Sequence, residues 1–301
     1  MIPTGRQTAL RYGDFTVIVT ELGATLRELT FRGRRLIAGF AENELPTGYR
    51  GAVLAPWPNR LADGHYRFSG QAQQLPLTEP DRRNALHGLV CYAPWQIQSA
   101  DAGTVRLTHR LWPQPGYPHL LDLATTYRLD ENGLTFTLTA VNAGDMPAPY
   151  GSSFHPYLTA GTGTIDDWTV HLPASSYLTV DPVRLLPKDL TPAGPYDFRK
   201  PTGLRGIEVD HAFTDIAYSE TGFAALTLTD PHGQGVRLTW DRHCPWLQLC
   251  TPGPQHPDLN RRALAVEPMT CPPDAFNTGV DLITLQPGDQ HRLKLTISPI
   301  R

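Results

Sequence analysis

Four short segments of the 301-residue chain concentrate side chains that can move protons or bind polar ligands. In one of them Glu267 ends a short apolar run and is followed by proline, so its carboxylate is expected at a strand end in partly apolar surroundings. Such surroundings raise a carboxyl pKa and make the group a better base near neutral pH. His87 and His155 need no shift, because imidazole has an ordinary pKa of about 6.5. The segments are residues 55–60, 84–88, 152–157 and 264–277.

These residue types predict a pocket that holds a base, an acid and polar anchors. Asn59 and Arg60, which follow a proline-stiffened turn, are the candidate anchors of the first segment. The alternative interpretation is that Glu267 caps a turn and that His87 and His155 only make hydrogen bonds within loops. Residue types and spacing by themselves are compatible with both interpretations.

Alternating apolar and polar residues recur along the chain and predict β-strands that bury one face. The turns at 130–133 and 230–233 contain Asn or Gly, which tolerate the positive φ of hairpin turns, so neighbouring strands are expected to be antiparallel. The proline-rich residues 181–201 are expected to form the longest irregular segment, a packed loop. The clearest alternating runs are 15–20, 104–108, 121–129, 134–141, 225–229, 235–240 and 291–297.

The composition is typical of a folded protein with many turns. The 29 prolines and 26 glycines argue against a mostly helical chain, because both residues destabilise helix interiors. With 40% hydrophobic and 18% charged residues, the chain has ample apolar side chains for a core. The composition therefore favours a β-dominated protein, while the length is compatible with one β-sandwich domain or with two domains.

Charge and hydropathy exclude several classes of partner. The formal net charge is −3 without a basic cluster, whereas nucleic acid or an anionic membrane surface requires a concentrated positive patch. The first residues contain no apolar stretch of signal-peptide length, and no later run approaches the roughly 20 residues that cross a bilayer, so we expect a cytoplasmic protein. The four cysteines form no CxxC pair and are expected to be reduced and partly buried.

Together the four segments resemble the signature of the aldose 1-epimerases, the galactose mutarotase family. Two further matches lie between them in the same order: residues 206–213, which include Asp210, and residues 246–251, which include Gln248. Each motif is weak alone, but six in order across residues 55–277 are specific. The resemblance implies a single all-β domain over residues 1–301, a large antiparallel β-sandwich of the galactose mutarotase-like type with few short helices. It also implies a cofactor-independent isomerase that interconverts the α and β anomers of a free sugar.

The resemblance further implies roles for individual residues. Glu267 is expected to be the base on the C1 hydroxyl and His155 the acid at the ring oxygen, with the two roles reversed on ring closure. His87 is expected either to assist protonation or to orient the sugar. The expected substrate-binding residues are Arg60, Asn59, Asp210 and Gln248.

The chain departs from the family pattern in the residues that follow His87, His155 and Glu267. These departures indicate a divergent bacterial-type branch, which includes proteins linked to sugars other than galactose, such as sulfoquinovose. The reaction type is expected to survive, while the substrate stays open between a free aldohexose and such a modified sugar. An anionic sugar would need a cation near its C6 substituent, and Arg82 and Arg83 are candidates.

Three other interpretations compete with this one. A metal enzyme is disfavoured because the sequence lacks a His-x-His or His-x-x-x-His pair and its candidate ligands are scattered. A glycoside hydrolase with Glu267 and Asp210 as its carboxylate pair leaves the histidines unexplained. A non-catalytic carbohydrate-binding protein would need neither an acid nor a base.

Trp57 and Trp95 are more typical of a core than of sugar-stacking platforms. We expect no metal, no cofactor, a small sugar as ligand and a monomer or homodimer.

Overall fold

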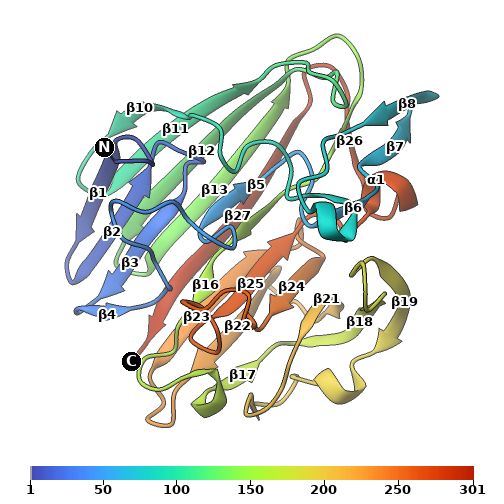
Figure 1. Cartoon of the computed structure of the whole chain (residues 1–301). Helices are drawn as coiled ribbons and strands as arrows, with labels where there is room; N and C mark the ends of the chain where they lie inside the picture. Colours follow the sequence, from blue (N-terminus) through green and yellow to red (C-terminus); the bar gives the residue numbers. More distant parts are fainter. Residues whose placement is uncertain (1) are drawn as a thin grey trace.

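The computed structural model describes residues 2–301, which form mostly antiparallel strands (Figure 1). A nine-stranded sheet contains the longest of them, and β12, β13 and β27 lie side by side within it. The predicted alternation and both predicted hairpin turns are confirmed in this sheet. In spatial order its strands are β10 (Gln96–Ala100), β11 (Thr104–Leu111), β12 (Leu121–Asp130), β13 (Gly133–Asn142), β27 (Gln290–Ile300), β23 (Gly235–Asp241), β22 (Phe223–Thr229), β17 (Thr169–His171) and β20 (Thr202–Gly203).

An eight-stranded sheet carries most of the segments that the sequence analysis singled out. Its first strand, β19, lies within residues 181–201, so the prediction of a wholly irregular segment there is wrong. Because β19 is an edge strand, its terminal prolines are tolerated and its exposed residues show no alternation. The strands are β19 (Pro187–Pro192), β18 (Ala174–Val180), β21 (Asp210–Ile216), β24 (Trp246–Cys250), β25 (Leu264–Met269), β15 (Ser153–His155) and β5 (Ala52–Leu54), with β16 (Tyr157–Leu158) beside β25.

The remaining elements are short or lie at the margins. In the part of the chain that the structure describes, no helix is long and apolar enough to cross a membrane. Strands β6, β7 and β8 gather with helix α1 at one end of the molecule. The further strands are β1 (Gln7–Tyr12), β2 (Phe15–Thr20), β3 (Leu26–Phe31), β4 (Arg34–Arg35), β6 (Arg60–Ala62), β7 (His65–Phe68), β8 (Gln71–Gln74), β9 (Asn84–Leu86), β14 (Ala148–Tyr150) and β26 (Ile283–Leu285). The helices are α1 (Ala275–Thr278) and the 3₁₀ segments η1 (Pro80–Arg82), η2 (Ile165–Asp167) and η3 (Gly194–Tyr196).

One cluster of buried side chains joins the nine-stranded sheet to the eight-stranded sheet. The ring of Phe136 on β13 stacks on that of Phe154 on β15 with 4.2 Å between centroids, and Tyr127 packs beside them. Trp57 and Trp95 are buried in the same core, as expected. The predicted large antiparallel β-sandwich with few helices is therefore confirmed.

The strand alternation that builds this core also creates a second, polar face. Strands β24 and β25 are buried on both faces; Leu249 and Val266 enter the core, while their neighbours Gln248 and Glu267 point to the opposite side. The register pairs Gln248 directly with Glu267 across the two strands. His155 follows the core residue Phe154 and shares this polar side for the same reason.

Replacing Phe154 with alanine is expected to lower the free energy of unfolding by about 3–5 kcal/mol, because the change removes a buried ring at the contact between the sheets. Urea unfolding measures the effect. The control is Phe223→Ala on β22, where the ring is 41% exposed, and it should change stability by less than about 1 kcal/mol. Equal losses in the two variants would contradict this description of the core.

Candidate active site

A cavity of about 210 Å³ opens on the polar side of the eight-stranded sheet. It is smaller than the roughly 300–1,000 Å³ typical of sites for drug-sized molecules, so it suits one small ligand. The residues predicted from separate sequence motifs all line it, and they come from β6, β15, β21, β24, β25 and two loops. They are Asn59, Arg60, His87, His155, Asp210, Gln248 and Glu267.

His155 and Glu267 form a close buried pair at the base of this cavity. The Nε2 atom of His155 lies 3.2 Å from Oε1 of Glu267, and the two side chains are 5% and 3% exposed. Burial raises the pKa of Glu267 well above its ordinary value; the Asp210 carboxylate adds to the rise and Arg60 opposes it. Burial also lowers the pKa of His155 to about 3. Both shifts favour the uncharged forms, so the pair holds one titratable proton, carried by Glu267.

Two residues in left-handed backbone conformation hold the second histidine. Asn59 has φ 56° and His87 has φ 62°, a region that non-glycine residues seldom adopt. The His87 backbone N–H donates to the Asn59 carbonyl at 3.0 Å, and the Asn59 N–H donates to Nδ1 of His87 at 3.2 Å. Burial lowers the pKa of His87 well below its ordinary value, with His155 and Arg60 adding to the effect. The neutral ring therefore carries its proton on Nε2 and can act as a hydrogen-bond donor.

The structure corrects one argument made against a metal site. His87, His155 and Glu267 are distant in sequence, yet each offers a possible ligand atom, and these atoms lie within 4.8 Å of one another. A metal-binding histidine normally donates its other ring N–H to an acceptor. The Nδ1 atom of His87 instead accepts a backbone N–H, and the proton occupies Nε2. This donor set fits a hydrogen-bonded ligand better than a metal ion.

The anchoring side of the cavity is a connected network of charges. The guanidinium of Arg60 donates to both carboxylate oxygens of Glu79, at 3.0 and 3.1 Å. Another guanidinium nitrogen lies 4.0 Å from Asp210, and the Gln248 amide donates to Asp210 at 2.6 Å. Burial opposes the charges of Arg60 and Glu79. The Asp210 and Glu79 carboxylates outweigh it and raise the pKa of Arg60, while pairing with Arg60 lowers the pKa of Glu79. The sequence analysis did not identify Glu79. The one sequence feature that could have indicated it is its position five residues before Asn84, the first residue of the segment 84–88.

Several buried polar atoms in the cavity lack partners among residues 2–301. Oε2 of Glu267, Oε1 of Gln248 and Nδ1 of His155 make no hydrogen bond there. An unsatisfied buried polar atom is costly and is uncommon in folded proteins. Gln248 and Glu267 are paired directly across β24 and β25, and both line the cavity.

Tyrosines, rather than the tryptophans, supply the aromatic lining. The ring of Tyr157 stacks on His155 with 5.0 Å between centroids, and Tyr49 contacts His87 edge-on at 4.6 Å. Trp57 and Trp95 do not line the cavity. His211 follows Asp210 in sequence but alternates to the other side, where it packs against the rings of two tyrosines.

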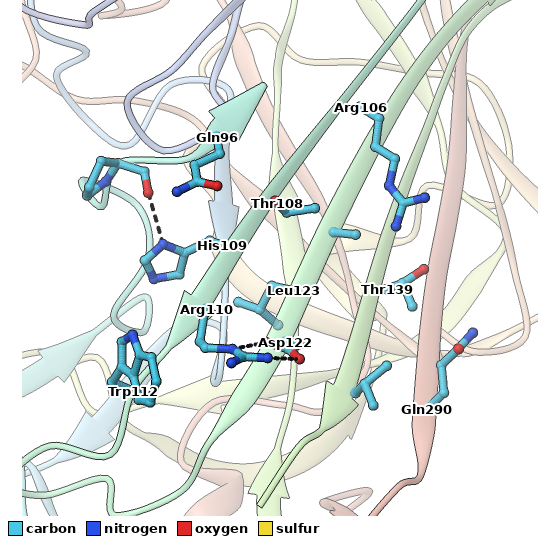
Figure 2. A pocket seen from close by; sticks show the side chains of 13 residues that line it. Gln96, Arg106, Thr108, His109, Arg110, Trp112, Asp122, Leu123, Thr139 and Gln290 are labelled. Carbon is cyan, nitrogen blue, oxygen red and sulfur yellow. Dashed lines mark hydrogen bonds and ion pairs between the residues drawn. The ribbon is translucent and has the colours of Figure 1, made fainter. Parts of the chain in front are cut away.

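A larger hollow of about 700 Å³ lies on the outer face of the nine-stranded sheet (Figure 2). Its one lining carboxylate, Asp122, is held by Arg110 through two hydrogen bonds of 2.6 and 2.7 Å. The Trp112 side chain is 62% exposed there. None of the seven predicted residues lines this hollow, and it pairs no acid with a base, so the cavity beside Glu267 is the better candidate site.

Comparisons with known proteins show what the whole chain is similar to. The family model described as aldose 1-epimerase matches residues 6–298. The uncharacterized protein YihR of Escherichia coli strain K12 is 36% identical over 297 residues, which cover 98% of this chain and 93% of that protein. Galactose mutarotase of Rattus norvegicus is 30% identical over 215 residues, 65% of this chain and 60% of that protein. The crystal structure of the GalM/aldose epimerase homologue from C. elegans has the same fold, with a TM-score of 0.85, 21% identity and coverage of 98% and 100%.

The raised pKa of Glu267 gives a stability prediction with a definite sign. In the unfolded chain a glutamate has a pKa of about 4.3. Because the folded pKa is higher, the buried neutral acid stabilises the folded protein fully below that pH, and this contribution is lost as pH rises. The Glu267→Gln variant has no such loss. Its free energy of unfolding should therefore rise relative to that of the wild type as pH increases from 4 to 8.

Urea unfolding at several pH values measures this difference. The exposed Glu208→Gln substitution is the control and should show no trend with pH. If the Glu267→Gln difference were constant across the pH range, the carboxyl group would not be held in its neutral form.

Proposed function

The chain belongs to the aldose 1-epimerase family, and we propose that it interconverts the α and β anomers of a free aldohexose by acid–base ring opening. The observation that carries the proposal is the buried His155–Glu267 pair beside a hydrogen-bond donor, His87, in a cavity for one small ligand. A carbohydrate-binding protein without turnover would not need this pair of proton-transferring groups.

Anomerisation needs only proton transfers. The C1 hydroxyl loses its proton, the ring oxygen gains one, and the C1–O5 bond breaks to give the open-chain aldehyde. Rotation about C1–C2 and the reverse steps then give the other anomer. Nothing is oxidised or reduced, so acid–base groups suffice. Each positioned transfer is typically worth about 10²–10⁴ in rate.

In the proposed mechanism Glu267 is the base and His155 the acid. The titratable proton of the pair starts on Glu267, and its transfer across the 3.2 Å contact gives the carboxylate and imidazolium needed for ring opening. Both forms contain the same number of protons, so sugar binding only has to shift the proton between them. We assign the unpartnered Oε2 of Glu267 to the C1 hydroxyl. Ring opening leaves Glu267 protonated and His155 neutral, and ring closure with reversed roles regenerates the carboxylate and the imidazolium.

The other cavity residues are proposed to hold the sugar. His87 donates its Nε2–H to the ring oxygen or to a neighbouring hydroxyl. The Arg60 guanidinium donates to hydroxyls, and Asp210 and Gln248 bind others as acceptor and amide. Asn59 already uses its side-chain oxygen to accept the Arg60 backbone N–H at 2.8 Å, which leaves its NH₂ group for the sugar.

Charge balance in the cavity favours a neutral aldohexose. Its two guanidinium groups, Arg60 and Arg82, both bind Glu79, and Asp210 and Glu267 add two further carboxyl groups. The second candidate is an anionic sugar such as sulfoquinovose, which Arg82 favours because its side chain is 41% exposed at the cavity. A sulfonate would have to compete with Glu79 for it. Arg83 pairs with an aspartate instead and does not line the cavity.

Freshly dissolved α-glucose or α-galactose should reach anomeric equilibrium faster in the presence of the protein, with no change in sugar mass. Polarimetry or one-dimensional NMR follows the reaction, and sulfoquinovose completes the panel to separate the two substrate candidates. Unchanged rates for every sugar at high protein concentration would contradict the proposal. Sugar binding without acceleration would instead identify a carbohydrate-binding protein.

Substitution of either member of the pair should act on turnover. Glu267→Gln and His155→Ala are each expected to lower kcat by about 10²–10⁴ while changing KM far less, because each removes one positioned proton transfer. Steady-state polarimetry provides both constants, with Glu208→Gln as the surface control. A variant that kept near-normal kcat would disprove the role assigned to its residue.

A further inference from the structure

The β18–β19 hairpin places its tip, residues 181–186, at the mouth of the cavity. The tip is an ordered turn. The Asp181 carboxylate accepts the backbone N–H groups of Val183 and Arg184 at 2.9 and 2.7 Å, and the Leu185 N–H donates to the Asp181 carbonyl at 2.8 Å. The sequence analysis assigned this segment only a packing role, whereas Leu185 lines the cavity.

Arg184 fastens the tip to the loop that carries the anchoring residues. Its guanidinium donates to the backbone carbonyls of Arg82 and Arg83, at 3.1 and 3.0 Å. In return, the buried amide of Asn84 donates to the Arg184 carbonyl at 3.0 Å and to the Glu79 carboxylate at 2.9 Å. The hairpin tip is therefore held in register with the carboxylate that binds Arg60.

The backbone at Leu185 adopts an uncommon conformation. Its φ is 54°, in the left-handed region where a branched side chain is disfavoured and glycine is common. Strained residues of this kind persist where surrounding contacts impose them, and they concentrate at functional sites. Here the imposed conformation places an apolar side chain in a cavity wall that Arg82 and Leu86 also line.

We propose that Leu185 determines specificity by closing the end of the cavity away from the His155–Glu267 pair, so that only a single sugar unit fits. The inference rests on the proposed function, which places C1 of the sugar at that pair. From Glu267, the contacts run through Gln248, Asp210, Arg60, Glu79 and Arg82 before they reach the hairpin tip.

This placement determines which sugars the wall excludes. In a pyranose C4 lies opposite C1, so a substituent on C4 would meet the Leu185 wall. Leucine offers no hydrogen bond to a second sugar unit and occupies its space. Monosaccharides with a free 4-hydroxyl are therefore accepted, and reducing disaccharides linked through O4 are rejected.

The Leu185→Gly variant tests the wall with glucose and maltose, which share the same reducing unit. Glycine suits the positive φ, so the melting temperature should not fall. The ratio of kcat/KM for maltose to that for glucose should rise at least 10-fold. If galactose is the substrate, galactose and a disaccharide with reducing, 4-linked galactose replace this pair. Val183→Ala, at a side chain 71% exposed on the same tip, is the control and should leave the ratio unchanged.

Arg184→Ala provides a second test that keeps Leu185 in place. Loss of the Arg184 hydrogen bonds to the Arg82 and Arg83 carbonyls should raise KM for the monosaccharide. It should also raise the ratio of kcat/KM for the disaccharide to that for the monosaccharide, while kcat changes much less. If both variants act on the monosaccharide and their disaccharide-to-monosaccharide ratio of kcat/KM equals that of the wild type, the role of Leu185 is overturned. The proposed function would then stay intact. Absence of anomerisation by the wild type would overturn the proposed function and, with it, this inference.

Discussion

The burial of His155 against Glu267 is the constraint on which the site depends. Two groups that could both carry charge lie 3.2 Å apart, almost without solvent. Desolvation disfavours the charged form of each, so both groups are neutral and the one titratable proton stays on Glu267. Moving that proton creates an acid and a base at once, without taking up or releasing a proton to solvent. In the proposed reaction this exchange opens and closes the sugar ring.

The sheet architecture provides this burial with little additional machinery. Because side chains alternate along β15, β24 and β25, the residues between the core positions Phe154, Leu249 and Val266 point to one common polar side. The rings of Tyr49, His87 and Tyr157 pack against His155, so this side is also covered. Reciprocal hydrogen bonds between Asn59 and His87 then fix the orientation of the His87 ring. The same strands therefore stabilise the fold and exclude water from the reacting groups.

Much of the fold could be predicted because alternation is a local signal, and the strands of the nine-stranded sheet follow it closely. The seven cavity residues came from ordered motifs, although nothing local indicated that they would converge. Edge strand β19 was missed because its exposed, proline-flanked residues do not alternate. Glu79 and Leu185 were missed for a different reason. The position of Glu79 depends on its contact with Arg60, 19 residues earlier in the chain. The position of Leu185 depends on its left-handed backbone and on the contact of Arg184 with Asn84, 100 residues away.

The protonation states of the two histidines test the central claim most directly. NMR of the protein labelled with ¹⁵N-histidine, assigned with His155→Asn and His87→Asn variants, reports the ring nitrogens. In the sugar-free protein between pH 5 and 8, the account predicts a neutral His155 and a neutral His87 with its proton on Nε2. An imidazolium signal from His155 across that range, or a His87 proton on Nδ1, would contradict it.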